Sequence, residues 1–315
     1  TRKNVVAGDV FLVSGQSNSY NGSESNRIYK GEFARSFGYI ADGINYATYN
    51  PADTLWDIAN SRPKVGLWAS EFQRLMIEKY KIPICIINGG SGGSSMQYNL
   101  LRTNNPADLS TSSGRLYYRV KKAGLLENIK AFIYRQGEFD ANDNAGALIW
   151  KESMIKHMEA LKKEYPGLQQ FYIPQINVLE GNQSNQGLVR ESQRQLVTAS
   201  PSIKGFATIG TQGYDGVHYS PDGHFQAAAE LFRIVASTQY GAPEQKAQYS
   251  PNIQRAYFST SDKLNVVLEF DQPVIVQSDT TVANKNGQLI KRTIAENLGF
   301  SAVKLNANYE WIIQN

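Results

Sequence analysis

Short apolar runs alternate with longer helical patterns over the first 240 residues, and this alternation constrains the fold more than any other feature. Apolar runs of strand length occur at 9–13, 82–87, 131–134, 170–176 and 203–209. Apolar side chains at helical spacing lie between and after these runs, at 69–80, 115–127, 146–164, 187–199 and 221–237. Strands separated by such helices form parallel sheets that are covered on both faces. The chain is therefore predicted to be α/β, a three-layer sandwich with a flavodoxin-like parallel five-stranded sheet.

The composition changes after this unit. Residues 241–246 (GAPEQK) have the composition of a linker, and beyond them 264–270 partly alternates while 273–276 is an apolar run. Asn286-Gly287 is a dipeptide typical of hairpin turns. We therefore expect one domain over residues 1–245 and a small β-rich C-terminal extension over 246–315.

Charge and cysteine content exclude several classes of protein. The chain has 32 Lys and Arg against 28 Asp and Glu, and a net charge of +4 is too small to imply a nucleic-acid partner. No apolar stretch approaches the roughly 20 residues of a membrane span. The single cysteine, Cys85, excludes an intrachain disulfide and any multi-cysteine metal site. Because the sequence starts at Thr1 and not at Met, we expect a removed targeting segment and a secreted or periplasmic protein.

Polar, glycine-rich segments follow four of the predicted strands. They are 15–18 (GQSN) after the first strand, 88–94 (NGGSGGS) after the second, 136–138 (QGE) after the third and 215–218 (DGVH) after the fifth. In open parallel sheets, ligands bind beyond the carboxyl ends of the strands. All four segments are therefore predicted to meet at one edge of the sheet.

Only one of the three histidines has the context of a catalytic base. His157 lies within a predicted helix and His224 in the first turns of the last one, where structural roles are expected. His218 precedes that last helix and follows Asp215 by three residues. This spacing allows the carboxylate to face imidazole Nδ1 and leaves Nε2 for a serine hydroxyl. A simple Asp-Gly turn beside a surface histidine would have the same spacing.

Acyl transfer also requires hydrogen-bond donors for the developing oxyanion. The candidates are the N–H of Ser17, the N–H of Gly90 and the side-chain amide of Gln136. Gly90 could equally belong to a plain turn, and Gln136 could be a satisfied polar residue at a strand end. The loop that contains Gly90 lacks the Gly-Lys-Ser/Thr ending of a phosphate-binding loop.

These blocks resemble the SGNH (GDSL-type) hydrolase superfamily, and within it the branch with sialate O-acetylesterases and plant-type acetylxylan esterases. That branch shows Gly-Gln-Ser-Asn where other members show Gly-Asp-Ser, matched by residues 15–18. It also shows an aromatic-rich Gln-Gly-Glu block, matched by 134–140, and a late Asp-x-x-His, matched by 215–218. The resemblance covers about residues 8–240.

The resemblance implies a role for each matched residue. Ser17 would be the nucleophile, His218 the general base and then acid, and Asp215 the orienting carboxylate. The Ser17 N–H, the Gly90 N–H and the Gln136 amide would form the oxyanion hole, with no cofactor. The third block departs from the family pattern, with Arg135 before the Gln and Phe139 after the Glu, and the second block is unusually long in Gly and Ser.

Aromatic side chains in or beside these loops suggest a sugar as the ligand. Flat rings with nearby amides suit a sugar ring, although such residues also pack loops and cores. The aromatic side chains in or beside these loops are those of Tyr20, Tyr46, Tyr49, Trp56, Trp68 and Tyr98. The residues predicted to bind substrate are Asn18, Glu138, Tyr20, Trp56 and Tyr98.

We predict a serine esterase that removes O-acetyl groups from a carbohydrate, acetylxylan or a sialic-acid-type substrate. One alternative is a non-catalytic carbohydrate-binding protein of the same fold, and another is a general carboxylesterase or lipase. Glu138 and Asp140 could also serve a glycosidase as a carboxylate pair. A metal site is not expected, because Asp215 and His218 have no convincing third ligand.

Overall fold

The computed structural model describes most of the first 274 residues and parts of the remainder. These are residues 5–22, 25–38, 50–52, 54–61, 64–179, 183–245, 248–263, 265–274, 279–283, 289–293, 303–305 and 311–313. Tyr46, Tyr49 and the Asn286-Gly287 turn lie outside the described residues.

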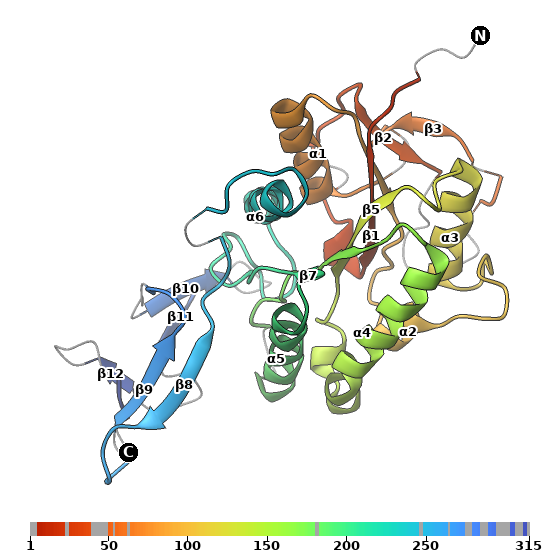
Figure 1. Cartoon of the computed structure of the whole chain (residues 1–315). Helices are drawn as coiled ribbons and strands as arrows, with labels where there is room; N and C mark the ends of the chain where they lie inside the picture. The colour runs from red at the N-terminus through yellow and green to blue at the C-terminus, as the bar shows by residue number, and fades with distance from the viewer. Residues whose placement is uncertain are drawn as a thin grey trace.

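A seven-stranded sheet in the order β3-β2-β4-β1-β5-β6-β7 forms the centre of the molecule (Figure 1). All neighbouring strands in it are parallel except β2 and β3. The strands are β1 (Asp9–Gly15), β2 (Ala34–Phe37), β3 (Trp56–Ile58), β4 (Ile84–Asn88), β5 (Ile129–Arg135), β6 (Gln170–Tyr172) and β7 (Ile203–Lys204).

The predicted fold class is confirmed, and the sheet is wider than predicted. The five predicted strands correspond to β1, β4, β5, β6 and β7, and their order in space is that of a flavodoxin-like sheet. The two further strands, β2 and β3, extend it on the β4 side. They are only four and three residues long, too short for a periodic pattern to mark them.

Helices cover both faces of this sheet. Successive residues of β1 face opposite sides, so that Phe11 packs in one apolar cluster and Leu12 in the other. The first cluster includes residues of α1 (Leu67–Tyr80) and α6 (Pro221–Gln239). The second includes residues of α2, α3, α4 and α5 (Met96–Leu100, Ser112–Ala123, Asn144–Glu164 and Gln183–Ala199). The molecule therefore has the predicted three layers.

The start of α6 follows its sequence signals. The Ser220 hydroxyl accepts a hydrogen bond from the Gly223 N–H at 3.3 Å, and Pro221 occupies the first helical position. This cap fixes where the helix begins, and therefore the length of the loop that carries His218.

The last part of the chain forms antiparallel strands, as predicted for a small β unit. Four of them make a sheet in the order β12-β13-β9-β8, and β10 pairs with β11 (Figure 1). Their bounds are β8 (Ile253–Phe258), β9 (Asn265–Phe270), β10 (Asp279–Ala283), β11 (Leu289–Thr293), β12 (Val303–Leu305) and β13 (Trp311–Ile313). Among the described residues, no helix combines the length and apolar character that a bilayer crossing requires.

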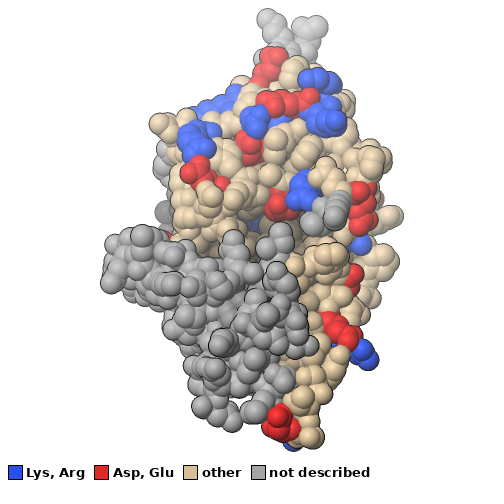
Figure 2. Space-filling view, turned by 90° about the vertical axis from the view of Figure 1, so that its left-hand side faces the viewer, with Lys and Arg blue, Asp and Glu red and all other residues tan. Residues whose placement is uncertain are grey.

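Charged side chains of both signs are interspersed on the molecular face shown in Figure 2. This distribution agrees with the small net charge of the chain. An extended basic stripe, the usual footprint of a nucleic-acid-binding surface, is absent from the described residues of that face.

His157 is buried in its neutral form beneath α2, and this makes stability depend on pH. Its Nδ1 lies 3.2 Å from Nη1 of Arg102, which pairs with Glu164. Because arginine only donates, Nδ1 must accept, so the ring proton is on Nε2. Burial, and next the charge of Arg102, lower the pKa of His157 well below its ordinary value. His157 is thus packed in the core, one of the roles expected for it.

We therefore predict that stability falls as the pH decreases below the pKa of unfolded histidine, about 6.5. Below that pH the unfolded chain binds a proton that the folded chain excludes. His157→Gln, whose amide oxygen can still accept from Arg102, should lose less Tm between pH 8 and pH 5 than the unsubstituted protein. Circular dichroism melts at both pH values measure this. Equal pH dependence in the two proteins would contradict the assignment.

Candidate active site

The site is centred on a hydrogen bond between two residues that are 201 positions apart. The Ser17 hydroxyl lies 2.9 Å from Nε2 of His218. Ser17 begins the 3-10 turn η1 (Ser17–Ser19) directly after β1, and His218 lies in the loop between β7 and α6. The structure thus brings together the hydroxyl and the imidazole that were predicted to meet at the carboxyl edge of the sheet.

The chain before Ser17 is held tightly against β5. The Gln16 N–H donates to the Arg135 carbonyl at 3.0 Å, so the pairing of β1 with β5 continues to the residue that precedes Ser17. Gly15 has a φ of +132°, and a Cβ there would lie 2.0 Å from the Arg135 carbonyl oxygen. Only glycine fits this position. The backbone therefore holds Ser17 in a fixed position just beyond the carboxyl end of β1.

Asn18 connects the serine turn to two other loops. Its Nδ2 donates to Oε1 of Glu138 at 2.6 Å and to the carbonyl of Val217 at 2.9 Å. Asn18 and Glu138 are 0% and 5% exposed. Both residues are buried and bonded to each other, and their predicted contact with substrate stays a prediction. They position the loops that carry Ser17 and His218.

Two buried charged residues, Arg135 and Glu138, interact with each other, and Glu138 also interacts electrostatically with His218. Burial raises the pKa of Glu138, an effect partly opposed by the hydrogen bond from Asn18 and by the charges of Arg135 and His218. Burial likewise lowers the pKa of Arg135. The Arg135 guanidinium lies between two rings, 5.0 Å from the centre of Trp68 and 5.4 Å from that of Tyr219. Arg135 and Glu138 therefore compensate each other electrostatically in a water-poor layer.

Asp215 contacts the backbone of the histidine loop and not its ring. Oδ1 accepts the N–H of Val217 at 2.9 Å and that of His218 at 2.6 Å, and the Asp215 N–H donates to the His218 carbonyl at 3.0 Å. Among the hydrogen bonds of the described residues, none joins this carboxylate to the imidazole. The expected bond to Nδ1 is thus absent from this structure, and the carboxylate stabilises the tight turn that presents the histidine.

Two of the three predicted oxyanion donors are occupied by protein acceptors. The Gly90 N–H donates to Oδ1 of Asn88 at 2.8 Å. Gln136 is fully buried, and its Nε2 donates to the Ser94 carbonyl and to Asp140, while its Oε1 accepts from Trp150. In this structure the Gln136 amide and the Gly90 N–H therefore have protein partners, and their part in an oxyanion hole stays a prediction. Only the Ser17 N–H has no acceptor among the described residues.

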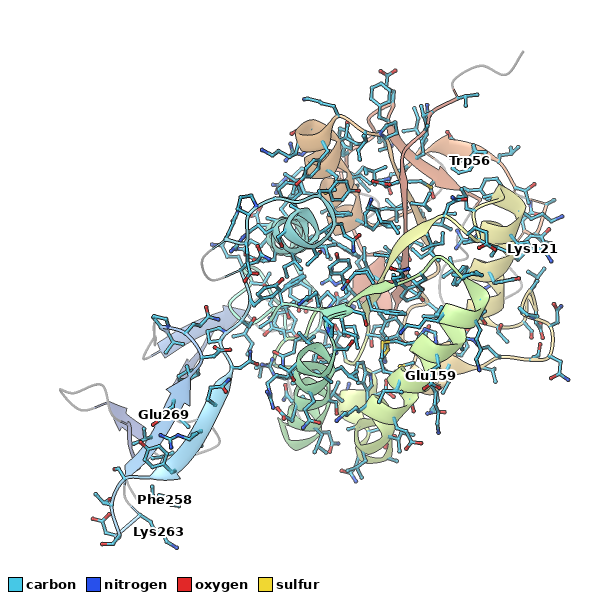
Figure 3. All side chains as sticks on the ribbon, viewed as in Figure 1. Trp56, Lys121, Glu159, Phe258, Lys263 and Glu269 are labelled. Carbon is cyan, nitrogen blue, oxygen red and sulfur yellow. The ribbon has the colours of Figure 1, made fainter. Side chains whose placement is uncertain are left out.

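The aromatic residues that were predicted to contact the sugar lie on different elements of the structure. Trp56 lies on the outer strand β3, is 49% exposed and packs its ring against Phe37 (Figure 3). Tyr98 belongs to α2, where its hydroxyl accepts a hydrogen bond from Arg115. Tyr20 is half-buried at the end of η1. Of these three aromatic residues, Tyr20 alone is adjacent in sequence to the serine turn.

Aromatic residues around the histidine loop were not predicted as part of the site. Tyr214 and Tyr219 flank the Asp-Gly-Val-His segment, are joined by an antiparallel bridge and pack ring against ring. The sequence signal was available, since two tyrosines enclose the four-residue motif. In the described part of the chain, no three His, Cys, Asp or Glu side chains are grouped so that they could hold a metal ion.

Comparison with known proteins identifies a family and a shared fold. The family model described as carbohydrate esterase, sialic acid-specific acetylesterase matches residues 7–237. No curated protein matches the sequence. The chain is similar to the structure of a carbohydrate acetylesterase from Xanthomonas citri, with 18% identity and a TM-score of 0.65, over 98% of this chain and 72% of that one.

Two further structures share the fold of the main domain. A protein from Arabidopsis thaliana is 18% identical with a TM-score of 0.53, over 74% of this chain and 99% of its own. The protein NanS is 13% identical with a TM-score of 0.54, over 76% of this chain and 100% of its own. These matches agree with the sheet order and the helix layers described above.

The bridging role of Asn18 leads to a prediction for Asn18→Ala. The substitution leaves Glu138 Oε1 and the Val217 carbonyl without this donor, which should cost about 1–3 kcal/mol of stability. A shift of His218 relative to Ser17 should reduce kcat for an aryl acetate about 100-fold. Melting temperature and steady-state kinetics test both effects.

Asn177→Ala is the matched control, because Asn177 is also buried and its Nδ2 donates to the Thr208 carbonyl at 3.0 Å. This variant should lose stability and keep its kcat. Equal kcat losses in the two variants would show that destabilisation alone explains the effect at Asn18.

Proposed function

We propose a Ser17–His218 mechanism for this chain, which belongs to the sialic acid-specific acetylesterase family of carbohydrate esterases and is a carbohydrate O-acetylesterase. The observation that supports the mechanism is the 2.9 Å contact between the Ser17 hydroxyl and Nε2 of His218. A serine becomes nucleophilic at neutral pH when a base at this distance removes its proton. The proposed substrate is an acetylated sugar of the acetylxylan or sialic acid type.

The reaction proceeds in two balanced half-reactions. In the first, Nε2 of His218 takes the Ser17 proton while the serine oxygen attacks the acetyl carbonyl carbon. The tetrahedral intermediate collapses, and the imidazolium returns the proton to the departing sugar oxygen, leaving Ser17 acetylated. In the second, Nε2 deprotonates a water that attacks the acetyl group. Acetate leaves and Ser17 recovers its proton.

Two carboxylates support the histidine in different ways. Asp215 holds the backbone of the loop through the N–H groups of Val217 and His218. Glu138, which is buried, interacts electrostatically with His218. Negative charge at that position stabilises the imidazolium that forms in the transition state.

Replacement of the nucleophile tests the proposal directly. Ser17→Ala should reduce acetate release by about 10⁴-fold or more, since removal of a triad member leaves only binding and oxyanion stabilisation. The assay measures acetate released from O-acetylated xylo-oligosaccharides and from O-acetylated sialic acid. Near-normal release by Ser17→Ala on either substrate would refute the mechanism.

A fluorophosphonate probe separates catalysis from mere binding. The probe should label the unsubstituted protein at Ser17 and leave Ser17→Ala unlabelled, because labelling requires an activated hydroxyl. A non-catalytic sugar-binding protein of this fold would bind glycans and remain unlabelled. The rates for acetyl and octanoyl esters then separate a sugar deacetylase from a general carboxylesterase.

The geometry of Asp215 predicts a difference between two substitutions. In Asp215→Asn the amide oxygen can still accept both backbone N–H groups, so kcat should fall about tenfold. Asp215→Ala removes that acceptor and frees the loop, and kcat should fall about 1000-fold. Steady-state kinetics of the two variants provide the test. If asparagine were as damaging as alanine, the charge of Asp215 would matter more than its hold on the loop.

A further inference from the structure

Arg135 contacts both sides of the proposed catalytic pair without belonging to it. It is the last residue of β5 and is 5% exposed. Its carbonyl accepts the N–H of Gln16, which precedes the nucleophile, at 3.0 Å. Its guanidinium lies over two aromatic rings, with Cζ 5.0 Å from the centre of Trp68 and 5.4 Å from that of Tyr219. Each of these rings is connected to one member of the pair.

The ring of Trp68 is connected to the serine. Trp68 is the second residue of α1 and is buried, and its indole N–H donates to the Ser19 carbonyl at 3.0 Å. Ser19 closes the η1 turn that Ser17 begins, and the Ser19 N–H donates to the Gln16 carbonyl at 2.8 Å. Because this turn has only three residues, a shift of Ser19 would displace Ser17 as well.

The ring of Tyr219 is connected to the histidine. Tyr219 directly follows His218 in the chain and is buried, and its hydroxyl donates to Oγ1 of Thr208 at 2.7 Å. The ring of Tyr214 packs against it with 5.0 Å between the ring centres. A displacement of this ring would therefore move the backbone of the residue next to it, which is His218.

Contacts with the two rings, more than hydrogen bonds, hold the guanidinium in place. Its Nη1 is buried and has no hydrogen-bond partner. In the described part of the chain, no hydrogen bond or ion pair joins it to Glu138, with which it interacts through charge alone. A guanidinium is flat and more weakly hydrated than an ammonium, and it stacks on aromatic faces. Arginine is therefore well suited to contact two rings in a buried position.

We propose that Arg135 is a positioning residue for the reaction. Its guanidinium connects the ring that holds the serine turn to the ring beside His218, and so helps to set the distance between the Ser17 hydroxyl and Nε2 of His218. The proposal rests on the proposed roles of Ser17 and His218. Asn18 joins the same two loops through the Val217 carbonyl, so Arg135 supplies a second and independent connection.

Arg135→Lys and Arg135→Met separate this role from a purely electrostatic one. Lysine keeps the positive charge and loses the flat guanidinium, whereas methionine keeps apolar contact and loses the charge. We expect kcat for an aryl acetate to fall about tenfold in Arg135→Lys and about 100-fold in Arg135→Met. KM should change less than about threefold, because Arg135 is buried. A normal kcat in Arg135→Lys would show that charge alone suffices and would overturn the proposal.

Arg102→Met is the control for the loss of a mostly buried arginine. The Arg102 side chain is 18% exposed and pairs with Glu164 at the end of α4. This variant should lose stability and keep both its kcat and its rate of fluorophosphonate labelling. Equal kcat losses in Arg102→Met and Arg135→Met would overturn the positioning role, because destabilisation alone would explain them. Arg135→Lys provides the test if Arg135→Met does not fold.

A double-mutant cycle tests whether Arg135 acts through the ring of Tyr219. Tyr219→Leu removes that ring and so already breaks the connection to the histidine. In this background Arg135→Met should reduce kcat less than about threefold further, against about 100-fold in the unsubstituted protein. Independent losses that multiply would overturn the proposal. An active Ser17→Ala protein would be a different failure, that of the proposed function, because the nucleophile itself would be wrong.

Discussion

The arrangement of the site depends on the amide of Asn18. A serine at the end of β1 and a histidine before α6 reach the same edge of the sheet, but strand order alone does not fix how the two loops contact each other. Asn18 Nδ2 donates to Glu138 after β5 and to Val217 beside the histidine, so one buried amide fixes both loops relative to the serine turn. The sheet order makes this possible, because β1 is the direct neighbour of β5. The 2.9 Å contact between Ser17 and His218 follows from these constraints.

Arg135 shows how a charged group can be buried close to the proposed site. An unpaired buried guanidinium is strongly unfavourable. At Arg135 the cost is offset by the rings of Trp68 and Tyr219 and by the nearby carboxyl of Glu138. The positive charge favours the ionised form of Glu138, although burial raises the pKa of that carboxyl.

The strand order, the layers and the edge that carries the site could be predicted from the sequence, because each depends on patterns of apolar residues and on the rules of parallel sheets. The partners of individual donors could not. The spacing of Gly90 and Gln136 places their backbones near Ser17, but it does not reveal that Asn88 and Asp140 already accept their N–H groups. The burial of Asn18 and Glu138 was missed for the same reason, since polar residues in a predicted loop are expected to be exposed.

In the proposed mechanism, Asp215 and Glu138 divide between them the tasks that a single triad carboxylate would perform. The Asp215 carboxylate is committed to the N–H groups of Val217 and His218, so it shapes the turn and orients the ring through the backbone. Glu138 lies in the dry layer, where a charge acts more strongly than it does near solvent. Burial raises the pKa of this carboxyl, and the hydrogen bond from Asn18 and then the charge of Arg135 oppose that effect. The proposed support of the imidazolium is therefore distributed over two loops. Asn18 bonds to both loops and so holds them in a fixed position relative to each other.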